Sequence, residues 1–254
     1  MQISGNTVLI TGGGSGIGRA LAEAFHAEGN QVIIAGRRQS VLDETTAANP
    51  GMKSAILDIE SEDAIHTFAD RLKADHPKLN VVIHNAGIMK PEKLESGETA
   101  TAESIVTTNL LGPIRLTAAL LPHLLTQPHG AILTVSSGLA FIPLAVTPTY
   151  CATKAAIHSY TQSLRFQLRD TKLQVIELVP PYVQTELMGS HQASDPRAMP
   201  LADYIAETMS ILKSTPDAKE VLVERVKPLR FSEVNGGYDQ FFVKFNIEAA
   251  SHAR

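Results

Sequence analysis

Short apolar runs alternate with longer amphipathic segments between residues 6 and 178. The apolar runs are rich in β-branched residues and predict strands, while the segments between them have the spacing of amphipathic helices. The predicted strands are residues 6–10, 31–35, 53–57, 80–84, 130–136 and 173–178. The predicted helices include residues 19–25, 40–48, 62–74, 102–125 and 149–169, the fourth continuing through Gly112-Pro113.

This alternation predicts an α/β fold of the Rossmann type, a doubly wound parallel β-sheet with helices on both faces. At 254 residues the chain fits a single domain, residues 1–254, for dinucleotide binding and catalysis. Ligands of such sheets lie beyond the carboxyl ends of the strands. The polar and glycine positions that follow predicted strands there are Gly12, Asp58, Asn85, Ser137 and Pro180.

The pattern becomes irregular after about residue 190, and residues 190–254 are expected to form a substrate-side lid and an atypical C-terminal segment. Residues 190–200 are small and polar, which is typical of a mobile segment, and they fit a substrate lid or an ordinary loop equally well. Residues 220–230 carry more charge than a buried strand tolerates, which favours a helix. A loose, charged terminus is expected after Phe241-Phe242.

Composition excludes several classes of protein. The net charge of −4 gives no basic surface for nucleic acid, and the single cysteine, Cys151, excludes an intrachain disulfide and fits a reducing compartment. No apolar run approaches the ~18 residues of a membrane span, and the first strand begins too near Met1 for a signal peptide. We therefore expect a cytoplasmic protein without a membrane or nucleic-acid partner. Cys151 itself is expected to be a small packing residue.

The loop after the first strand reads T-G-G-G-S-G-I-G and leads into a helix. Strand, glycine loop and helix together are the context of a dinucleotide site, because glycines let the backbone approach pyrophosphate and the helix start supplies N–H groups. The predicted cofactor contacts in this loop are Gly12, Ser15, Gly16, Ile17 and Gly18. The alternative is a flexible glycine-rich turn.

A phenol and an ammonium lie four residues apart at Tyr150 and Lys154. On a helix this spacing places both on one face, and a nearby cation favours the phenolate and lowers the pKa of the tyrosine toward neutrality. Tyr150 is therefore a candidate general acid/base. The alternative is a chance pairing of a half-buried ring with a solvated amine.

Strand two ends in Gly36-Arg37-Arg38, where an NAD-preferring protein carries an acidic residue. Gly36 leaves space and Arg37 offers donors for a 2′-phosphate, to which Arg38 adds charge. The sequence therefore predicts NADP rather than NAD as the cofactor, with nothing nearby to repel the 2′-phosphate. The alternative is that both arginines are merely solvated. No H-x-H or H-x-x-x-H pair supports a metal site, so we expect packing or surface roles for the histidines.

The glycine loop together with Ser137, Tyr150 and Lys154 resembles the short-chain dehydrogenase/reductase family, over residues from about 7 to 185. The resemblance implies a catalytic tetrad of Asn109, Ser137, Tyr150 and Lys154. It adds further cofactor contacts at Asp58, Asn85, Ala86, Gly87, Tyr150, Lys154, Pro180, Val183 and Thr185. Pro180-Pro181 and the tail resemble the branch related to the oxidoreductase of lipoteichoic-acid D-alanylation operons.

The resemblance further implies an oxidoreductase that transfers hydride between NADP(H) and a small alcohol/carbonyl substrate. Tyr150 would protonate the oxygen that Ser137 binds, Lys154 would lower the Tyr150 pKa and hold the ribose, and Thr185 would bind the carboxamide. Asn109 would distort its helix and hold a water that connects the lysine with bulk solvent.

Two residues and the assembly leave alternatives open. Asp58 is either an adenine contact or a loop carboxylate or helix cap, and Asn109 before Gly112-Pro113 also fits a helix kink. Residues 102–125 and 149–169 together carry more apolar side chains than one stripe, so a homodimer or homotetramer is expected. The alternative function is a non-catalytic dinucleotide sensor, which would not need the tetrad.

Overall fold

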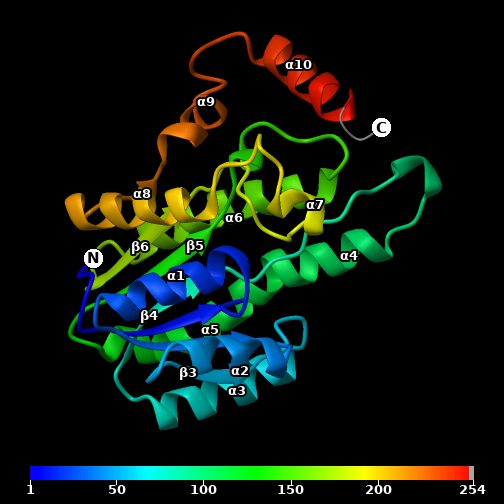
Figure 1. The fold of residues 1–254 in the computed structure, drawn as a ribbon. Helices are drawn as coiled ribbons and strands as arrows, with labels where there is room; N and C mark the ends of the chain where they lie inside the picture. Colours follow the sequence, from blue (N-terminus) through cyan, green and yellow to red (C-terminus); the bar gives the residue numbers. More distant parts are fainter. Residues whose placement is uncertain (252–254) are drawn as a thin grey trace.

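The computed structural model describes residues 1–251, in which seven parallel strands form one sheet between two layers of helices (Figure 1). Across the sheet the strands run in the order β3-β2-β1-β4-β5-β6-β7. Their bounds are β1 Thr7–Thr11, β2 Gln31–Gly36, β3 Lys53–Ile56, β4 Leu79–His84, β5 Gly130–Val135, β6 Leu173–Leu178 and β7 Glu220–Val221. The predicted doubly wound parallel sheet is confirmed.

Successive residues of the strands feed two separate cores, because neighbouring side chains of a strand point to opposite faces. Val8 and Ile10 join the core under α1, α2 and α8, whereas Leu9 joins the core under α3, α5 and α6. The long helices are α1 Gly16–Ala27, α2 Gln39–Ala48, α3 Glu62–Asp75, α5 Gly112–Thr126, α6 Pro148–Gln167 and α8 Leu201–Ser214. The central strands β1, β2 and β4 are therefore apolar at most positions, whereas β3 carries Lys53 and Ser54.

The predicted long helix over residues 102–125 is distorted in its middle. It consists of α4 (Ala100–Val106), a π-helical turn at Thr107–Leu111 and α5, which begins at Gly112. A Cβ on Gly112 would lie 2.8 Å from the Ile59 carbonyl oxygen, so the close approach of the two segments requires glycine. The predicted kink before Gly112 thus corresponds to one wide turn that contains Asn109.

The continuous helix Ala100–Thr126 is long and apolar enough to cross a membrane, by length and composition alone. The sequence prediction concerned an uninterrupted apolar run, which this helix does not contain, because Asn109 and Arg115 interrupt it. On its inner side Leu116, Leu120 and Leu124 pack in the core with α3. A helix of a protein core meets the same criterion, because it too must be apolar over much of its surface.

The C-terminal segment differs from its prediction in two places. Glu220 and Val221 form the short strand β7 beside β6, and only the following residues are helical, in a 3-10 turn at Glu224–Val226 and in α9 (Lys227–Arg230). The charge of Glu220 is tolerated in the sheet because Arg230 donates to both carboxylate oxygens at 2.8 and 3.0 Å. The expected loose terminus is instead the helix α10 (Tyr238–Ser251), at the upper edge of Figure 1.

The expected lid segment contains a short helix, α7 (Ser190–Ala193), followed by a stretch that pairs with the chain after β6. Met199 accepts from Gln184 N at 2.9 Å and donates to Tyr182 O at 2.8 Å. The remaining short elements are 3-10 turns at Leu94–Ser96 and Gly138–Ala140. Residues 252–254 of the predicted C-terminal segment lie outside the described part of the chain.

Candidate active site

The glycine loop connects β1 to α1 and adopts backbone angles that other residues avoid. Gly12 and Gly16 have φ of 66° and 51°, in the left-handed region. A Cβ on Gly18 would lie 2.2 Å from the Gly12 carbonyl oxygen, so the first turn of α1 packs directly on the loop. Three of the predicted contacts are thus glycines for a steric reason that the structure shows.

Hydrogen bonds join the segment after β4 to this loop. Asn85 Nδ2 donates to the carbonyls of Thr11 and Gly12 at 3.0 and 3.3 Å, and Thr11 Oγ1 accepts from the N–H groups of Asn85 and Ala86, both at 3.1 Å. Thr11 was not among the predicted site residues. Its signal in the sequence was its place directly before the first glycine of the loop.

The helix start at this loop fits the pyrophosphate of a dinucleotide. Ser15 is exposed at the N-cap of α1, and its side chain makes no capping hydrogen bond, so the first-turn N–H groups remain available to an anion. Ile17 lies partly buried against the core. Gly87 completes the cradle, since a Cβ there would lie 3.3 Å from Asn109 Oδ1. These residues fit a bound dinucleotide.

Glu60, which follows β3, lies beside Arg37 at the predicted 2′-phosphate site at the end of β2. Arg37 Nη1 lies 3.0 Å from Glu60 Oε1, and the Arg37 side chain is 55% exposed. The expectation that nothing nearby would repel a 2′-phosphate was therefore wrong, because Glu60 arrives from a distant part of the sequence. Gly36 does leave open space, and Arg38 is exposed at the start of α2.

Asp58 lies half-buried just beyond β3, at the predicted edge of the sheet. Its Oδ1 accepts from Glu60 N at 3.1 Å, which shapes the turn into α3. Ser61 provides the helix cap by accepting from Ala64 N at 3.2 Å. The cap alternative for Asp58 is thereby removed, while its role as an adenine contact stays a prediction.

Ser137, Tyr150 and Lys154 are brought together from β5 and the first turns of α6, and all three are buried. Ser137 follows β5, and its side chain is near enough to the Tyr150 hydroxyl to favour the phenolate and lower the tyrosine pKa. The neighbouring Ser136 instead directs its hydroxyl to the Leu178 carbonyl at 3.5 Å. The geometry thus separates the two serines in favour of Ser137, the one chosen from the sequence.

The pKa of Tyr150 is raised, in contrast to the expectation from its pairing with Lys154. Burial is the main cause, and the hydrogen bond with Ser137 opposes it only in part. Lys154 Nζ lies 5.5 Å from the centroid of the tyrosine ring and donates to Val135 O at 2.7 Å. The ammonium therefore stands beneath the ring, and the groups that shift the Tyr150 pKa are burial, Ser137 and Cys151 rather than Lys154.

Lys154 is itself strongly affected by its surroundings. Burial lowers the pKa of its ammonium to about 8, and the buried carboxylate of Glu177 acts in the opposite direction. A lysine with such a pKa can exchange its proton near neutral pH. The buried pair of Tyr150 and Lys154 thus has the perturbed titration that functional sites often show.

Asn109 lies in the π-helical turn between α4 and α5, and its side chain faces the site. Its Oδ1 accepts from Ile88 N at 2.8 Å, and its Nδ2 donates to Ile88 O at 2.9 Å and to Thr153 Oγ1 at 3.3 Å. The amide therefore connects the segment after β4 with α6. The widened turn agrees with the predicted distortion.

Glu92, which the sequence analysis missed, fastens the start of α6. Its two carboxylate oxygens accept from Thr149 N at 3.1 Å and from Thr149 Oγ1 at 2.8 Å. A carboxylate at a helix start satisfies free N–H groups and interacts favourably with the helix dipole. The residue directly before Tyr150 is therefore held in place. No local motif signals this contact, because Glu92 lies in a loop far from α6 in sequence.

A second group that the sequence analysis did not predict consists of His158, Glu177 and Glu220. His158 Nδ1 is 2.8 Å from Glu177 Oε2, Glu177 is 0% exposed, and both lie close enough to Glu220 for their ligand atoms to surround a metal ion. Arg230 already pairs with Glu220, so the cluster balances its charges with protein groups. Sequence spacing could not show it, because each of these residues comes from a different element.

The predicted nicotinamide-side loop follows β6. Pro180 and Pro181 are buried, and Pro180 accepts from Gly138 N at 2.9 Å. Gln192 of the lid segment is buried and donates to Val183 O at 2.8 Å and to Thr185 Oγ1 at 3.0 Å. The lid segment is thus attached to the loop that is expected to bind the cofactor.

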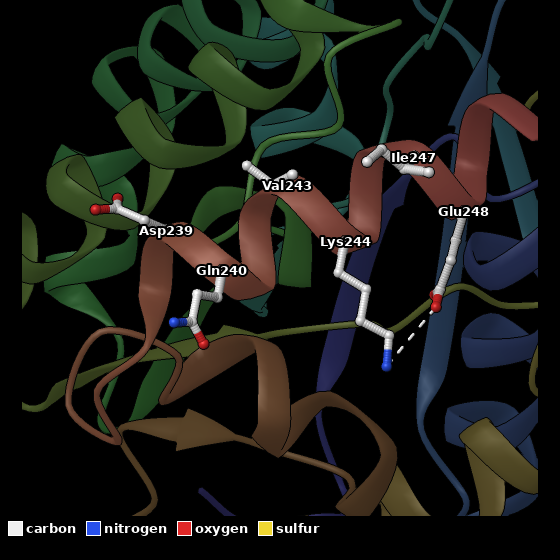
Figure 2. A pocket seen from close by; sticks show the side chains of 6 residues that line it. All are labelled: Asp239, Gln240, Val243, Lys244, Ile247 and Glu248. Atoms are coloured by element: carbon white, nitrogen blue, oxygen red, sulfur yellow. Dashed lines mark ion pairs between the residues drawn. The ribbon is translucent and has the colours of Figure 1, made fainter.

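A separate hollow lies on the outer side of α10, away from these residues (Figure 2). All the side chains that line it belong to this one helix, and Lys244 pairs with Glu248 across one turn. None of the predicted catalytic residues contributes to it. The candidate site is therefore the edge of the sheet at β1, β4, β5 and β6.

Comparison with known proteins agrees with this arrangement. Residues 6–196 match the family model described as short chain dehydrogenase. The chain is 38% identical to the uncharacterized oxidoreductase DltE of Bacillus subtilis over 98% of this chain and 99% of that protein. The predicted relation to the D-alanylation-operon branch is thereby confirmed.

Solved structures of short-chain dehydrogenases share the fold. One from Burkholderia phymatum in complex with NAD has a TM-score of 0.83 at 19% identity, covering 96% of each chain. A closed form of serine dehydrogenase complexed with NADP+ has a TM-score of 0.75 at 26% identity, covering 82% of this chain and 89% of that one. With its family match, its glycine loop and its buried serine, tyrosine and lysine, this chain belongs to the short-chain dehydrogenase/reductase family of oxidoreductases.

Proposed function

We propose that the protein is an NADP-dependent oxidoreductase that interconverts an alcohol and a carbonyl compound, with Tyr150 as general acid/base. The observation that carries this proposal is the buried group of Ser137, Tyr150 and Lys154 at the same edge of the sheet as the glycine loop. A binding module has no need of a buried serine and tyrosine beside a buried ammonium.

Each residue of the site has a separate proposed role in reduction of the carbonyl compound. Bound NADPH would supply the hydride for the carbonyl carbon. Ser137 would hold the carbonyl oxygen by a hydrogen bond while Tyr150 donates its proton to that oxygen. The phenolate would then be reprotonated from the Lys154 side, where the ammonium stabilises it and the low pKa of Lys154 favours transfer.

The raised pKa of Tyr150 suits the acid role before the cofactor and substrate arrive, because burial keeps the phenol protonated. Asn109 would keep Lys154 connected with solvent through its place beside Ile88 and Thr153 on α6. We also propose that Lys154 and Tyr150 contact the ribose, that Asp58 contacts the adenine, and that Thr185 contacts the carboxamide.

NADP is the proposed cofactor, because Gly36, Arg37 and Arg38 offer space and charge at the end of β2. Glu60 weakens this preference, since a 2′-phosphate would compete with it for Arg37. The serine dehydrogenase of similar fold was solved with NADP+, whereas the Burkholderia enzyme was solved with NAD. The Arg37 pair therefore decides the cofactor, and NAD is the less favoured choice.

The deciding experiment is a survey of ketones, aldehydes and alcohols with NADPH, NADH and their oxidised forms, followed by cofactor absorbance. Turnover of at least one carbonyl compound, with NADPH preferred, is the expected result. Tight cofactor binding without turnover of any compound would favour the alternative, a non-catalytic dinucleotide sensor.

The proposed assembly is a homodimer or homotetramer formed through α4, α5 and α6. Of the apolar residues expected to exceed one stripe, Leu116, Leu120, Ile157 and Leu164 are buried within the chain. Leu111 and Phe166 remain exposed and are available for a partner copy. A monomer mass by light scattering at micromolar concentration would contradict this. The proposed location is the cytoplasm, and the proposed partner is a small alcohol or carbonyl substrate.

A further inference from the structure

Apolar side chains from two loops border the catalytic tyrosine. Ile105, Tyr150 and Cys151 form a small buried cluster that is separate from the two cores of the sheet. The partly buried apolar side chains that pack against this cluster are Ile88, Met89, Leu139 and Leu144. Part of each remains accessible, so a substrate beside Tyr150 would meet apolar surface there.

Near this surface the Lys154 ammonium is buried beneath the Tyr150 ring, and the Glu92 carboxylate lies at the start of α6. Glu92 stands one residue from Tyr150 through its bonds to Thr149, and its carboxylate would repel a second negative charge. An apolar substituent, in contrast, gains free energy when it leaves water, about 0.8 kcal/mol for each buried CH₂. The surroundings of Tyr150 thus match a neutral substrate with an apolar group.

Leu144 is the most firmly held of these apolar residues. Its N–H donates to Cys151 Sγ at 3.2 Å, and its carbonyl accepts from Thr147 N at 2.9 Å. The peptide groups on both sides of it are bound by one side chain, Asn246, which donates to Pro143 O at 3.1 Å and accepts from Ala145 N at 2.6 Å. The backbone that carries the Leu144 side chain is therefore held on both sides.

Asn246 comes from α10, about a hundred residues further along the chain. The side of this helix that faces the protein carries Phe241, Phe242 and Phe245, all partly buried, while Ile247 on the other side is 65% exposed. Figure 2 shows Val243 and Ile247 on the outer side of the helix. The amide of Asn246 thus joins α10 to the loop between Ser137 and Tyr150.

We propose that Leu144 determines substrate specificity, that Asn246 of α10 positions it, and that the site selects neutral carbonyl compounds with an apolar substituent. This inference rests on the proposed function. It assigns to α10 a place on the substrate side of the active site, through a single amide that bridges two peptide groups.

The test compares kcat/KM for 2-butanone, 2-hexanone and the anion 5-oxohexanoate, with saturating NADPH. For the wild type we expect 2-hexanone to exceed both other compounds at least tenfold, because two more methylenes are buried and no charge is. In Leu144→Ala the ratio of 2-hexanone to 2-butanone should fall at least threefold. Asn246→Ala should lower the same ratio, and the matched control Ile247→Ala on the exposed side should leave it unchanged.

A second readout is independent of turnover. Amide hydrogen exchange at Ala145 should become at least tenfold faster in Asn246→Ala and stay unchanged in Ile247→Ala, since only the former loses the bond. If Leu144→Ala fails to fold, Leu144→Val takes its place.

Several outcomes would overturn the inference. Equal turnover of 5-oxohexanoate and 2-hexanone would overturn the substrate class, and an unchanged ratio in Leu144→Ala would overturn the role of Leu144. A changed ratio in Leu144→Ala but not in Asn246→Ala would overturn the role of α10. Absence of turnover of every ketone by the cofactor-bound wild type would overturn the proposed function itself, and the inference with it.

Discussion

The cofactor side and the chemistry side of this active site are built from different materials. The cofactor side, residues 11–18, consists of backbone and glycines, and its shape depends on left-handed angles and on close contacts such as that of Gly18 with Gly12 O. The chemistry side consists of buried polar side chains, Ser137, Tyr150 and Lys154, each supported by groups from other elements.

This difference determines how a substitution would impair each side of the site. On the cofactor side a substitution acts sterically, because an added side-chain atom would clash with a fixed peptide group. A site of buried side chains fails electrostatically, because removing one partner leaves another unsatisfied or changes its pKa. Variants that separate cofactor affinity from turnover therefore test whether the two sides are as independent as their construction implies.

The largest effect is expected on the chemistry side, from Tyr150→Phe. The change removes the proton donor but keeps the buried ring, so kcat should fall about 100-fold or more while cofactor affinity changes little. Steady-state kinetics and a cofactor titration check both halves of this statement. Retention of more than a tenth of the wild-type kcat would remove Tyr150 from its role.

On the cofactor side, Gly18→Ala should have the next largest effect. Its Cβ would lie 2.2 Å from Gly12 O and 2.3 Å from Asn85 Nδ2, so the loop must shift. We expect cofactor affinity to fall at least tenfold and the free energy of unfolding to fall by about 1–3 kcal/mol. Gly16→Ala is the graded comparison, because its Cβ would meet Thr185 only at 3.5 Å.

Equal losses in Gly18→Ala and Gly16→Ala would show that backbone angle rather than contact distance limits the loop, since Gly16 has the positive φ. Isothermal titration with NADPH and urea unfolding provide the two measurements.

The pKa of Lys154 predicts how the free energy of unfolding depends on pH. Its pKa is about 8 in the folded protein, compared with its ordinary value of 10.5. Between these values the unfolded chain binds more protons than the folded one, so this group makes stability rise with pH. From pH 7 to 9.5 the wild type should gain about 2 kcal/mol relative to Lys154→Met.

Urea unfolding of both proteins at pH 7, 8.5 and 9.5 measures this gain. The raised pKa of Tyr150 is common to both proteins and cancels to first order in the difference. Parallel pH profiles for the two would show that the Lys154 ammonium is not destabilised by burial.

The smallest expected effect is the choice of cofactor, which depends on exposed groups. The wild type should bind NADPH more tightly than NADH, and Gly36→Asp/Arg37→Ile should reverse the order, with changes of about tenfold. Glu60→Gln sharpens the test, because it frees Arg37 and should raise NADPH affinity. Equal affinities of the wild type for the two cofactors would contradict the proposal.

The sequence predicted the elements that are fixed by local rules. Six strands were placed to within one residue at each end, because apolar β-branched runs bounded by glycine and proline leave few alternatives. Tyr150 and Lys154 share α6 and are one turn apart, so their proximity could also be predicted. The rule failed at β7, which was predicted to be helical because of its charge; Glu220 is tolerated in the sheet because Arg230 pairs with it.

Local patterns in the sequence predicted six strands in chain order, the glycine loop, and the placing of Tyr150 and Lys154 one turn apart on α6, while the link to Ser137 came from the family resemblance. The groups that surround them are visible only in the folded chain: Glu60 beside Arg37, Glu92 on Thr149, Glu177 near Lys154, and Asn246 around Leu144. The physical reason is that periodicity and backbone angles act over a few residues, whereas a pKa or a fixed side-chain direction depends on charges and hydrogen bonds from segments that meet only in the folded chain. The sign of the Tyr150 pKa shift shows this directly, because its main cause is burial, which no spacing encodes.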